Sequence, residues 1–127
     1  MANESILTRW SDIPVEHLNP YIDRQYVVGT NIMLTQFLLK KGAHVPLHSH
    51  DNEQVSHIVS GVIKFVLEGK EVLVRGGEIL CIPPGVPHEA IVLEDVLAFD
   101  IFSPPRQDWI DREDSYLRGD SNPPLSK

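Results

Sequence analysis

Three histidines and a glutamine stand at spacings that would let one metal ion hold all four side chains. His48 and His50 are two residues apart, so they project from the same face if this stretch is a β-strand. Turn-forming residues follow, and a strand returning from that turn would bring Gln54 opposite the pair. His88 comes from a second segment, directly after a rigid loop rich in proline and glycine. Imidazole nitrogens and an amide oxygen suit zinc, nickel, iron or manganese, so the set predicts a site for one divalent metal ion.

Neighbouring residues leave the exact ligand set open. His44 shares strand parity with His48 and could be a fifth ligand, although a proline between them can disturb the alternation. A shift of one position in the returning strand would offer Glu53 in place of Gln54. His57 has the parity opposite to Gln54, so we expect it to point away from the metal, into packing or an interface.

A second group of chemically capable residues lies near the end of the last predicted strand. Asp100 and Phe102 share one strand face, and an acid among apolar neighbours needs either a partner or a function. A carboxylate beside a metal can move protons, and Arg106 could bind a substrate carboxylate with its planar guanidinium. We therefore take Asp100, Phe102 and Arg106 as candidate catalytic residues. The alternative is that Asp100 and Arg106 form a structural ion pair.

Short strands would have to position these side chains. Strand-like stretches separated by glycine, proline and asparagine turns cover residues 31–39, 43–50, 54–60, 62–68, 71–75, 78–83, 89–93 and 96–102. Short strands at regular spacing predict an all-β sandwich or barrel rather than an α/β fold. A jelly-roll barrel would also leave a cavity that ligands can line.

Two flanking segments complete the predicted organisation. We divide the chain into an N-terminal arm (residues 1–29), a barrel (30–103) and a C-terminal tail (104–127). In the arm, Ser11 or Asp12 could cap a short helical turn that Pro20 ends.

The tail carries three large side chains spaced to pack a short helical segment onto the barrel, namely Trp109, Tyr116 and Leu117. Its final residues, with two adjacent prolines, are expected to be disordered.

Composition excludes several classes of protein. A length of 127 residues suits one domain, and no apolar run approaches the roughly 18 residues of a membrane span. A formal net charge of −7 makes nucleic acid an unsuitable partner. The first residues do not resemble a secretory signal, so we expect a cytoplasmic location. The single cysteine, Cys81, cannot form an internal disulfide and is interpreted as a small core residue.

Both metal-ligand segments resemble the two sequence motifs of the cupin family. The first motif (Gly, five residues, His-x-His, three or four residues, Glu, six residues, Gly) is matched by Gly42, His48, His50, Gln54 and Gly61. The second is matched by Gly77, Pro83, Gly85 and His88. Gln54 stands where the family usually has Glu, and Val92 where it usually has Asn. The resemblance implies a single-domain cupin jelly-roll barrel with a metal centre, and it implies a homodimer.

The stretch from Asp100 to Trp109 resembles a subgroup of small cupins that act in pectin degradation and convert 4,5-unsaturated uronates to open-chain keto forms. That resemblance implies His48, His50, Gln54 and His88 as metal ligands, with Asp100, Phe102 and Arg106 near the barrel mouth.

The amide of Gln54 removes one negative charge from the predicted ligand set. The bound ion would keep its full charge, which favours anionic substrates and non-redox chemistry. We therefore expect an isomerase-type or lyase-type enzyme of carbohydrate metabolism that acts on a small anionic molecule. The alternatives are a polyketide cyclase-like cupin, a metal-dependent dioxygenase, and a cupin that binds a small molecule without turnover.

Overall fold

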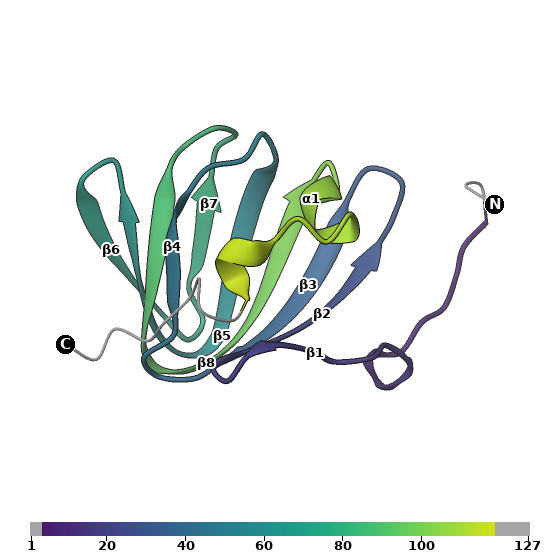
Figure 1. Cartoon of the computed structure of the whole chain (residues 1–127), viewed down its shortest axis with the longest axis horizontal. Helices are drawn as coiled ribbons and strands as arrows, with labels where there is room; N and C mark the ends of the chain where they lie inside the picture. The colour runs from purple at the N-terminus through teal and green to yellow at the C-terminus, as the bar shows by residue number, and fades with distance from the viewer. Residues whose placement is uncertain (1–3, 119–127) are drawn as a thin grey trace.

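Strands form most of the chain because inward-facing apolar residues alternate with outward-facing ones along it. The computed structural model describes residues 4–118 (Figure 1). In chain order its elements are η1 (Trp10–Asp12), β1 (Glu16–Asn19), β2 (Ile22–Val28), β3 (Met33–Leu39), β4 (His44–His48), β5 (Glu53–Leu67), β6 (Lys70–Arg75), β7 (Ile79–Ile82), β8 (His88–Ser103), α1 (Gln107–Ile110) and η2 (Ser115–Leu117). Within the described residues, no helix is long and apolar enough to cross a membrane.

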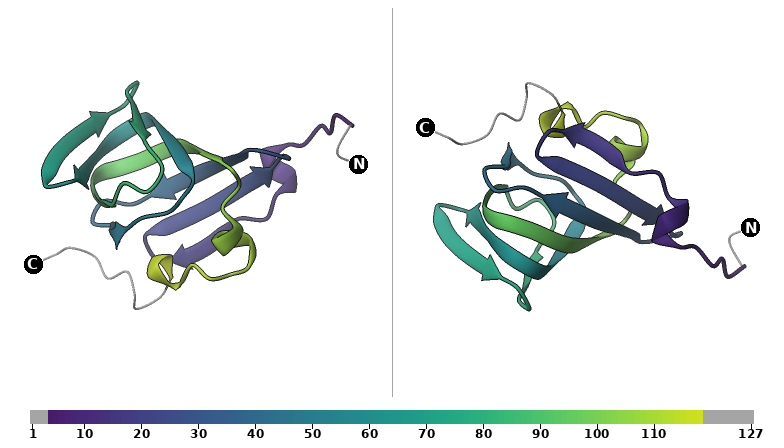
Figure 2. Two further views of the ribbon diagram at one scale, coloured as in Figure 1. Left: turned by 90° about the horizontal axis from the view of Figure 1, so that it is seen from above. Right: turned by 90° about the horizontal axis from the view of Figure 1, so that it is seen from below.

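Two long antiparallel strands, β5 and β8, hold the sheet together. They pair with each other over almost their whole length. The strand order of the sheet is β1-β2-β3-β8-β5-β6, and in addition β4 pairs with β8 and β7 pairs with β5. One half of each long strand therefore belongs to one side of the barrel and the other half to the opposite side. Figure 2 shows the resulting curled sheet from above and below. This arrangement confirms the predicted all-β cupin fold with a short C-terminal helix.

The bend in β5 occurs at Gly61, where the sequence pattern suggested a turn between two strands. Gly61 has a φ of 91°, and an added Cβ would lie 2.0 Å from the backbone oxygen of Asp95 on β8. Register shifts in the β5–β8 pairing cluster around the same position. The predicted breaks at Gly61 and near Asp95 are therefore bends within continuous strands, because the backbones approach each other too closely for a side chain.

The prediction of a helical turn that ends at Pro20 is wrong, because the helical segment is limited to η1. Residues 16–28 instead form β1 and β2, and β2 pairs with β3 along its whole length. Leu18 and Ile22 are buried in the core, and Pro20 lies in the turn that joins the two strands. The sheet thus extends into the segment that the sequence assigned to an arm, because inward-facing side chains there complete the core.

Cys81 also differs from its interpretation as a core residue. It is exposed on β7, whereas its neighbour Ile82 is 1% exposed. The alternation of strand faces explains the difference, since burying Ile82 turns Cys81 outward.

The C-terminal segment after β8 packs on the barrel as predicted. Trp109 in α1 and Leu117 in η2 are each 3% exposed. The side-chain amide of Asn19 donates to the carbonyl of Leu117 over 2.9 Å, and both views of Figure 2 place this segment beside the N-terminal strands. The expected disorder of the last residues concerns positions outside the described range.

Candidate metal centre

The structure brings His48, His50 and His88 together at one end of the barrel. His48 ends β4 and lies directly opposite His88, which begins β8. His50 follows in the turn before β5. One nitrogen of each ring lies within 4.8 Å of a nitrogen of the other two, and no other group of three possible ligand side chains among residues 4–118 meets that criterion. Three imidazoles are therefore near enough to bind one ion.

Each of the three rings is held with its Nδ1 against a backbone carbonyl two residues away. The acceptors are Pro46, Asn52 and Val86, at 2.8, 3.0 and 2.9 Å for His48, His50 and His88. Burial lowers the pKa of His48 and of His50 to about 4, and it lowers the pKa of His88. All three rings are thus neutral near neutral pH, with Nδ1 carrying the proton. Each Nε2 therefore offers a lone pair, which is the form that binds a metal.

Hydrogen bonds made by the side-chain nitrogen of Gln54 orient its amide group. Its Nε2 donates to the hydroxyl of Ser56 over 2.9 Å and lies 3.5 Å from Oδ2 of Asp100. Its Oε1 is consequently turned toward His50, 3.0 Å from Nε2 of that ring. Because His50 carries its proton on Nδ1, this contact sets two lone pairs against each other. A cation between them would turn this repulsion into coordination.

His88 supplies a second indication that a cation belongs in the centre. Its Nε2 is buried and has no hydrogen-bond partner among the described residues. A buried polar atom without a partner is costly, and a metal ion would satisfy it. Three neutral imidazoles and an amide oxygen therefore fit a divalent metal ion.

Strand parity decides between Gln54 and Glu53. Gln54 is 5% exposed and lines the cavity, whereas Glu53 is exposed on the outer side of β5. Neither of the two histidines that the sequence analysis considered beside the ligand set belongs to the cluster. His44 pairs with the carboxylate of Glu89, and His57 lies in register between Phe99 and Ile79 on the outward-facing side of β5. Neither reaches the three converging rings, in agreement with the parity of His57.

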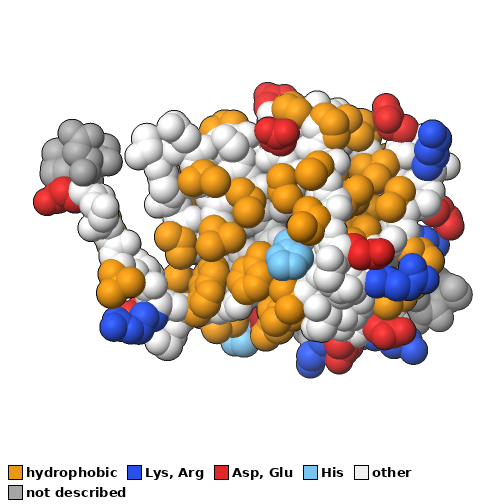
Figure 3. All heavy atoms as spheres, turned by 180° about the vertical axis from the view of Figure 1, so that it is seen from behind, with side chains coloured by type: hydrophobic (Ala, Val, Ile, Leu, Met, Phe, Trp, Pro, Cys, Tyr) orange, Lys and Arg blue, Asp and Glu red, His pale blue; other side chains and the backbone are white. Residues whose placement is uncertain are grey.

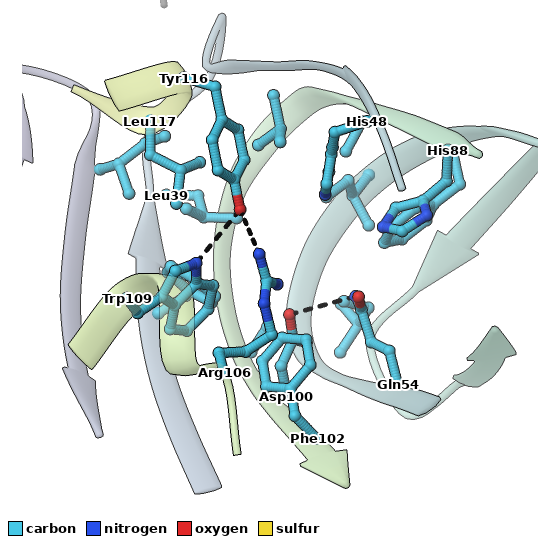
Figure 4. A pocket seen from close by; sticks show the side chains of 18 residues that line it. Leu39, His48, Gln54, His88, Asp100, Phe102, Arg106, Trp109, Tyr116 and Leu117 are labelled. Atoms are coloured by element: carbon cyan, nitrogen blue, oxygen red, sulfur yellow. Dashed lines mark hydrogen bonds between the residues drawn. The ribbon is translucent and has the colours of Figure 1, made fainter. Parts of the chain in front are cut away.

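A cavity extends from the histidines into the barrel (Figure 4). Asp100 projects into it from β8, and burial raises the pKa of its carboxyl to about 6, against a hydrogen bond from Ser56 and the positive charge of Arg106. Both protonation states of Asp100 are therefore accessible near neutral pH. Phe102, two residues further along β8, packs edge-on against His50 with ring centroids 5.8 Å apart.

Arg106 is buried at the same cavity but does not pair with Asp100. Its Nε and Nη2 donate to the carboxylate of Asp108 over 2.9 and 2.7 Å, and Nη2 also donates to the hydroxyl of Tyr116 over 2.6 Å. The guanidinium lies over the rings of Phe102 and Trp109. The ion pair that we considered between Asp100 and Arg106 is therefore formed with Asp108 instead, and Nη1 keeps no protein partner among residues 4–118.

Two residues beside the candidate ligands had no chemical role in the sequence interpretation. Ser56 orients Gln54, and Tyr116 lies with its ring centroid 4.9 Å from that of His48. Strand parity with Gln54 could have identified Ser56. Nothing in the local sequence around Tyr116 distinguishes a cavity residue from one that only packs.

Comparison with known proteins identifies the family of this chain. The family model described as "Cupin domain" matches residues 35–102, which is more than half of the chain. This chain belongs to the cupin family. Among curated relatives, it is 26% identical over 102 residues to the pectin degradation protein KdgF of Dickeya dadantii, covering 78% of this cupin and 93% of the relative.

Two solved structures match this fold over nearly the whole of their own chains. KdgF from a Halomonas species matches with a TM-score of 0.77 and 26% identity over 84% of this cupin and 99% of that chain. An RmlC-like cupin from Shewanella frigidimarina matches with a TM-score of 0.77 and 25% identity over 86% and 99%. Oxalate decarboxylase from Bacillus subtilis shares the fold at a TM-score of 0.67 and 19% identity, covering 81% of this cupin and 31% of that chain.

Proposed function

We propose that this cupin is a metal-dependent, non-redox enzyme that opens 4,5-unsaturated uronates and converts them to their keto forms. The observation that carries the proposal is the composition of a single cavity. Neutral metal donors, a carboxyl with a pKa of about 6 and a buried guanidinium line the same space. The resemblance to the KdgF proteins supports the choice of substrate.

His48, His50, His88 and Gln54 would hold the metal ion. When bound, a divalent ion would supply positive charge that attracts the uronate carboxylate and polarises its oxygens. Because every proposed ligand is neutral, none of them offsets that charge. This electrostatic balance favours an anionic substrate and disfavours a higher oxidation state of the metal.

Arg106 and Phe102 would bind and orient the substrate. Nη1 of Arg106 is the guanidinium nitrogen that its two protein partners leave free, so it can donate to one oxygen of a carboxylate. The hydrogen bonds from the other two guanidinium nitrogens to Asp108 fix the direction of the Nη1 donor. Phe102 offers an apolar wall beside His50 for a face of the sugar ring.

Asp100 would move the protons of the reaction. Ring opening transfers the proton of the C1 hydroxyl to the ring oxygen, and the resulting enol then loses its oxygen-bound proton while C4 gains one. The reaction is an isomerisation, so the carboxyl that accepts a proton at one position returns it at another. A group with a pKa near the working pH suits that exchange.

The test begins with elemental analysis of the purified protein and continues with the metal restored. Unsaturated uronates made by pectate lyase absorb ultraviolet light through their conjugated double bond, so conversion is followed as loss of that absorbance. We expect conversion by the metal-loaded wild type and its loss in Asp100→Asn with metal content retained. Glu94→Gln, which removes an exposed carboxylate on the same strand, is the control. Failure of the metal-loaded wild type to bleach the substrate would contradict the proposed reaction.

We also propose that a second copy of the chain covers the outer face of the sheet. Apolar side chains gather there over several strands, as Figure 3 shows. Leu34, Leu38, Val59 and Ile79 are exposed by 37, 52, 39 and 60%, and Phe99 lies between them. Monomeric proteins rarely expose a continuous apolar surface of this kind, and a self-complementary contact would bury it.

Sedimentation velocity tests this assembly. We expect the wild type to be a dimer and Ile79→Lys to be a monomer. Ile110→Lys, which changes an apolar residue on α1 that is 39% exposed, should remain a dimer because α1 lies in front of the sheet in Figure 1, away from the outer face. A monomeric wild type at micromolar concentration would contradict the proposal.

A further inference from the structure

Tyr116 stands in the cavity beside the groups assigned to chemistry above. It belongs to η2, far from the cupin motifs, and its hydroxyl points toward Arg106 and Trp109 in Figure 4. The ring lies against His48, and the residue lines the same cavity as Asp100. A ligand held at the histidines would therefore meet Tyr116 as well.

The hydrogen bonds of the Tyr116 hydroxyl fix the direction of its proton. Its oxygen accepts from Nη2 of Arg106 over 2.6 Å and from Nε1 of Trp109 over 3.1 Å. Both partners can only donate, so neither can accept the hydroxyl proton. Among residues 4–118 the hydroxyl has no other hydrogen-bond partner, and the remaining direction opens on the cavity. Tyr116 thus presents an O–H donor for which no described residue is the acceptor.

We propose that the Tyr116 hydroxyl donates a hydrogen bond to an oxygen of the bound uronate and so helps to select the substrate, an inference that rests on the proposed function. The positive charge of Arg106 draws electron density from the phenol oxygen and strengthens this donor. Tyr116 would act beside Arg106 on oxygen atoms of the same ligand.

Contacts on both sides of Tyr116 hold its segment against the N-terminal strands. Asp114 is fully buried and pairs with Nη2 of Arg24 on β2 over 2.8 Å. Leu117 is buried and its carbonyl accepts from Asn19, as described above. The hydroxyl is therefore held in place before a ligand arrives, which reduces the entropy lost on binding.

Galacturonate is a suitable probe because it carries the uronate oxygens but lacks the double bond that reacts. Its affinity for the metal-loaded protein is measured by calorimetry, together with the metal content of each variant. Tyr116→Phe should weaken galacturonate binding about tenfold, the usual effect of one lost hydrogen bond, with the metal content unchanged. Tyr26→Phe is the matched control, since Tyr26 also packs on Trp109 but does not line the cavity.

A second replacement separates donation to the ligand from support of Arg106. p-Aminophenylalanine at position 116 keeps an N–H donor but is a poor acceptor for Arg106 and Trp109. Affinity within about twofold of the wild type supports donation to the ligand. A loss as large as that of Tyr116→Phe would show that the hydroxyl only positions Arg106, and the inference would be overturned.

Galacturonate binding tests the role of Tyr116, and turnover tests the proposed reaction, so either proposal can be contradicted without the other. Equal galacturonate affinities of the wild type and Tyr116→Phe overturn the inference even if unsaturated uronates are converted. Binding that is weakened by Tyr116→Phe and retained by p-aminophenylalanine supports it even if no conversion is found, in which case the proposed reaction alone is wrong. A wild type that binds no galacturonate overturns the inference, while conversion of the unsaturated substrate still decides the reaction.

Discussion

Replacing the Gln54 amide by a carboxylate tests whether the Gln54 nitrogen faces the Asp100 carboxylate beside the candidate metal centre. In the structure Nε2 of Gln54 lies 3.5 Å from Oδ2 of Asp100. Gln54→Glu would set a carboxylate oxygen where this amide donor now lies. Two unit charges at that separation repel each other by about 5 kcal/mol at an effective dielectric constant of about 20.

Proton uptake limits how much of this repulsion the metal-free variant experiences. The pKa of Asp100 is already raised to about 6, and each pH unit above that value costs about 1.4 kcal/mol to keep one proton on the pair. Near pH 8 the cost is about 3 kcal/mol, which is less than the repulsion, so the pair stays singly protonated. The folded variant then binds one more proton than the folded wild type, and its relative stability falls as pH rises above about 6.

Urea unfolding of the metal-free proteins measures the effect. Gln54→Glu should lose about 3 kcal/mol of unfolding free energy near pH 8 and about 1 kcal/mol or less near pH 5. Gln107→Glu is the control, because Nε2 of Gln107 donates to Asp111 over 3.1 Å on the exposed surface, where such a change costs little. Added metal should remove the pH-dependent loss, since the new carboxylate would bind the cation. A loss equal at both pH values would refute the arrangement of Gln54 and Asp100.

Three further perturbations test the candidate metal centre, the bend in β5 and the ion pairs of Asp114 in the C-terminal segment. His48→Ala and His88→Ala should each lose most of the bound metal in elemental analysis, and full retention in both would contradict the proposed ligands. Gly61→Ala should destabilise the protein in chemical unfolding by over about 2 kcal/mol more than Gly69→Ala, and equal losses would exclude the clash. Both glycines have positive φ, but an added Cβ meets a backbone oxygen at 2.0 Å only at Gly61, with nothing within 4 Å at Gly69. Burial opposes ionisation of Asp114, yet hydrogen bonds and ion pairs with two arginines lower its pKa overall, so its contribution is present above about pH 4 and is lost as pH falls through the lowered pKa. Asp114→Asn should therefore flatten the fall of stability with acid, measured by unfolding between pH 3 and pH 7, and an unchanged slope would argue against these ion pairs.

Strand parity made the centre visible in the sequence. The alternation that turns Gln54 inward is a local property of the extended backbone of β5, whereas His50 lies in the turn beyond the end of β4. The tight loop before His88 likewise follows from its prolines and glycine. These local features made each donor a candidate. The meeting of His48 with His88 depends on the distant pairing of β4 with β8, and it was the two cupin-like motifs together that indicated it.

Features that depend on distant contacts were beyond the same reasoning. β1 is only four residues long, and its place in the sheet depends on pairing with β2 and on burial of Leu18. The partner of Arg106 differs from the one considered, because Asp108 in α1, and not Asp100 on β8, reaches its guanidinium. Tyr116 reaches the cavity only because Asp114 and Leu117 dock the tail from either side.

One pair of strands positions both the proposed metal ligand Gln54 and the proposed proton carrier Asp100. Gln54 and Ser56 on β5 lie in register with Phe102 and Asp100 on β8, so the acid, the hydroxyl and the amide follow one another across the sheet. The carboxylate of Asp100 accepts from Ser56, which leaves the Ser56 oxygen to accept from Gln54 and turns the Gln54 oxygen toward Nε2 of His50. A change at Asp100 therefore alters the orientation of a ligand as well as proton transfer. Lost turnover in Asp100→Asn identifies a proton carrier only when metal affinity is unchanged, whereas reduced affinity would assign Asp100 to orienting Gln54.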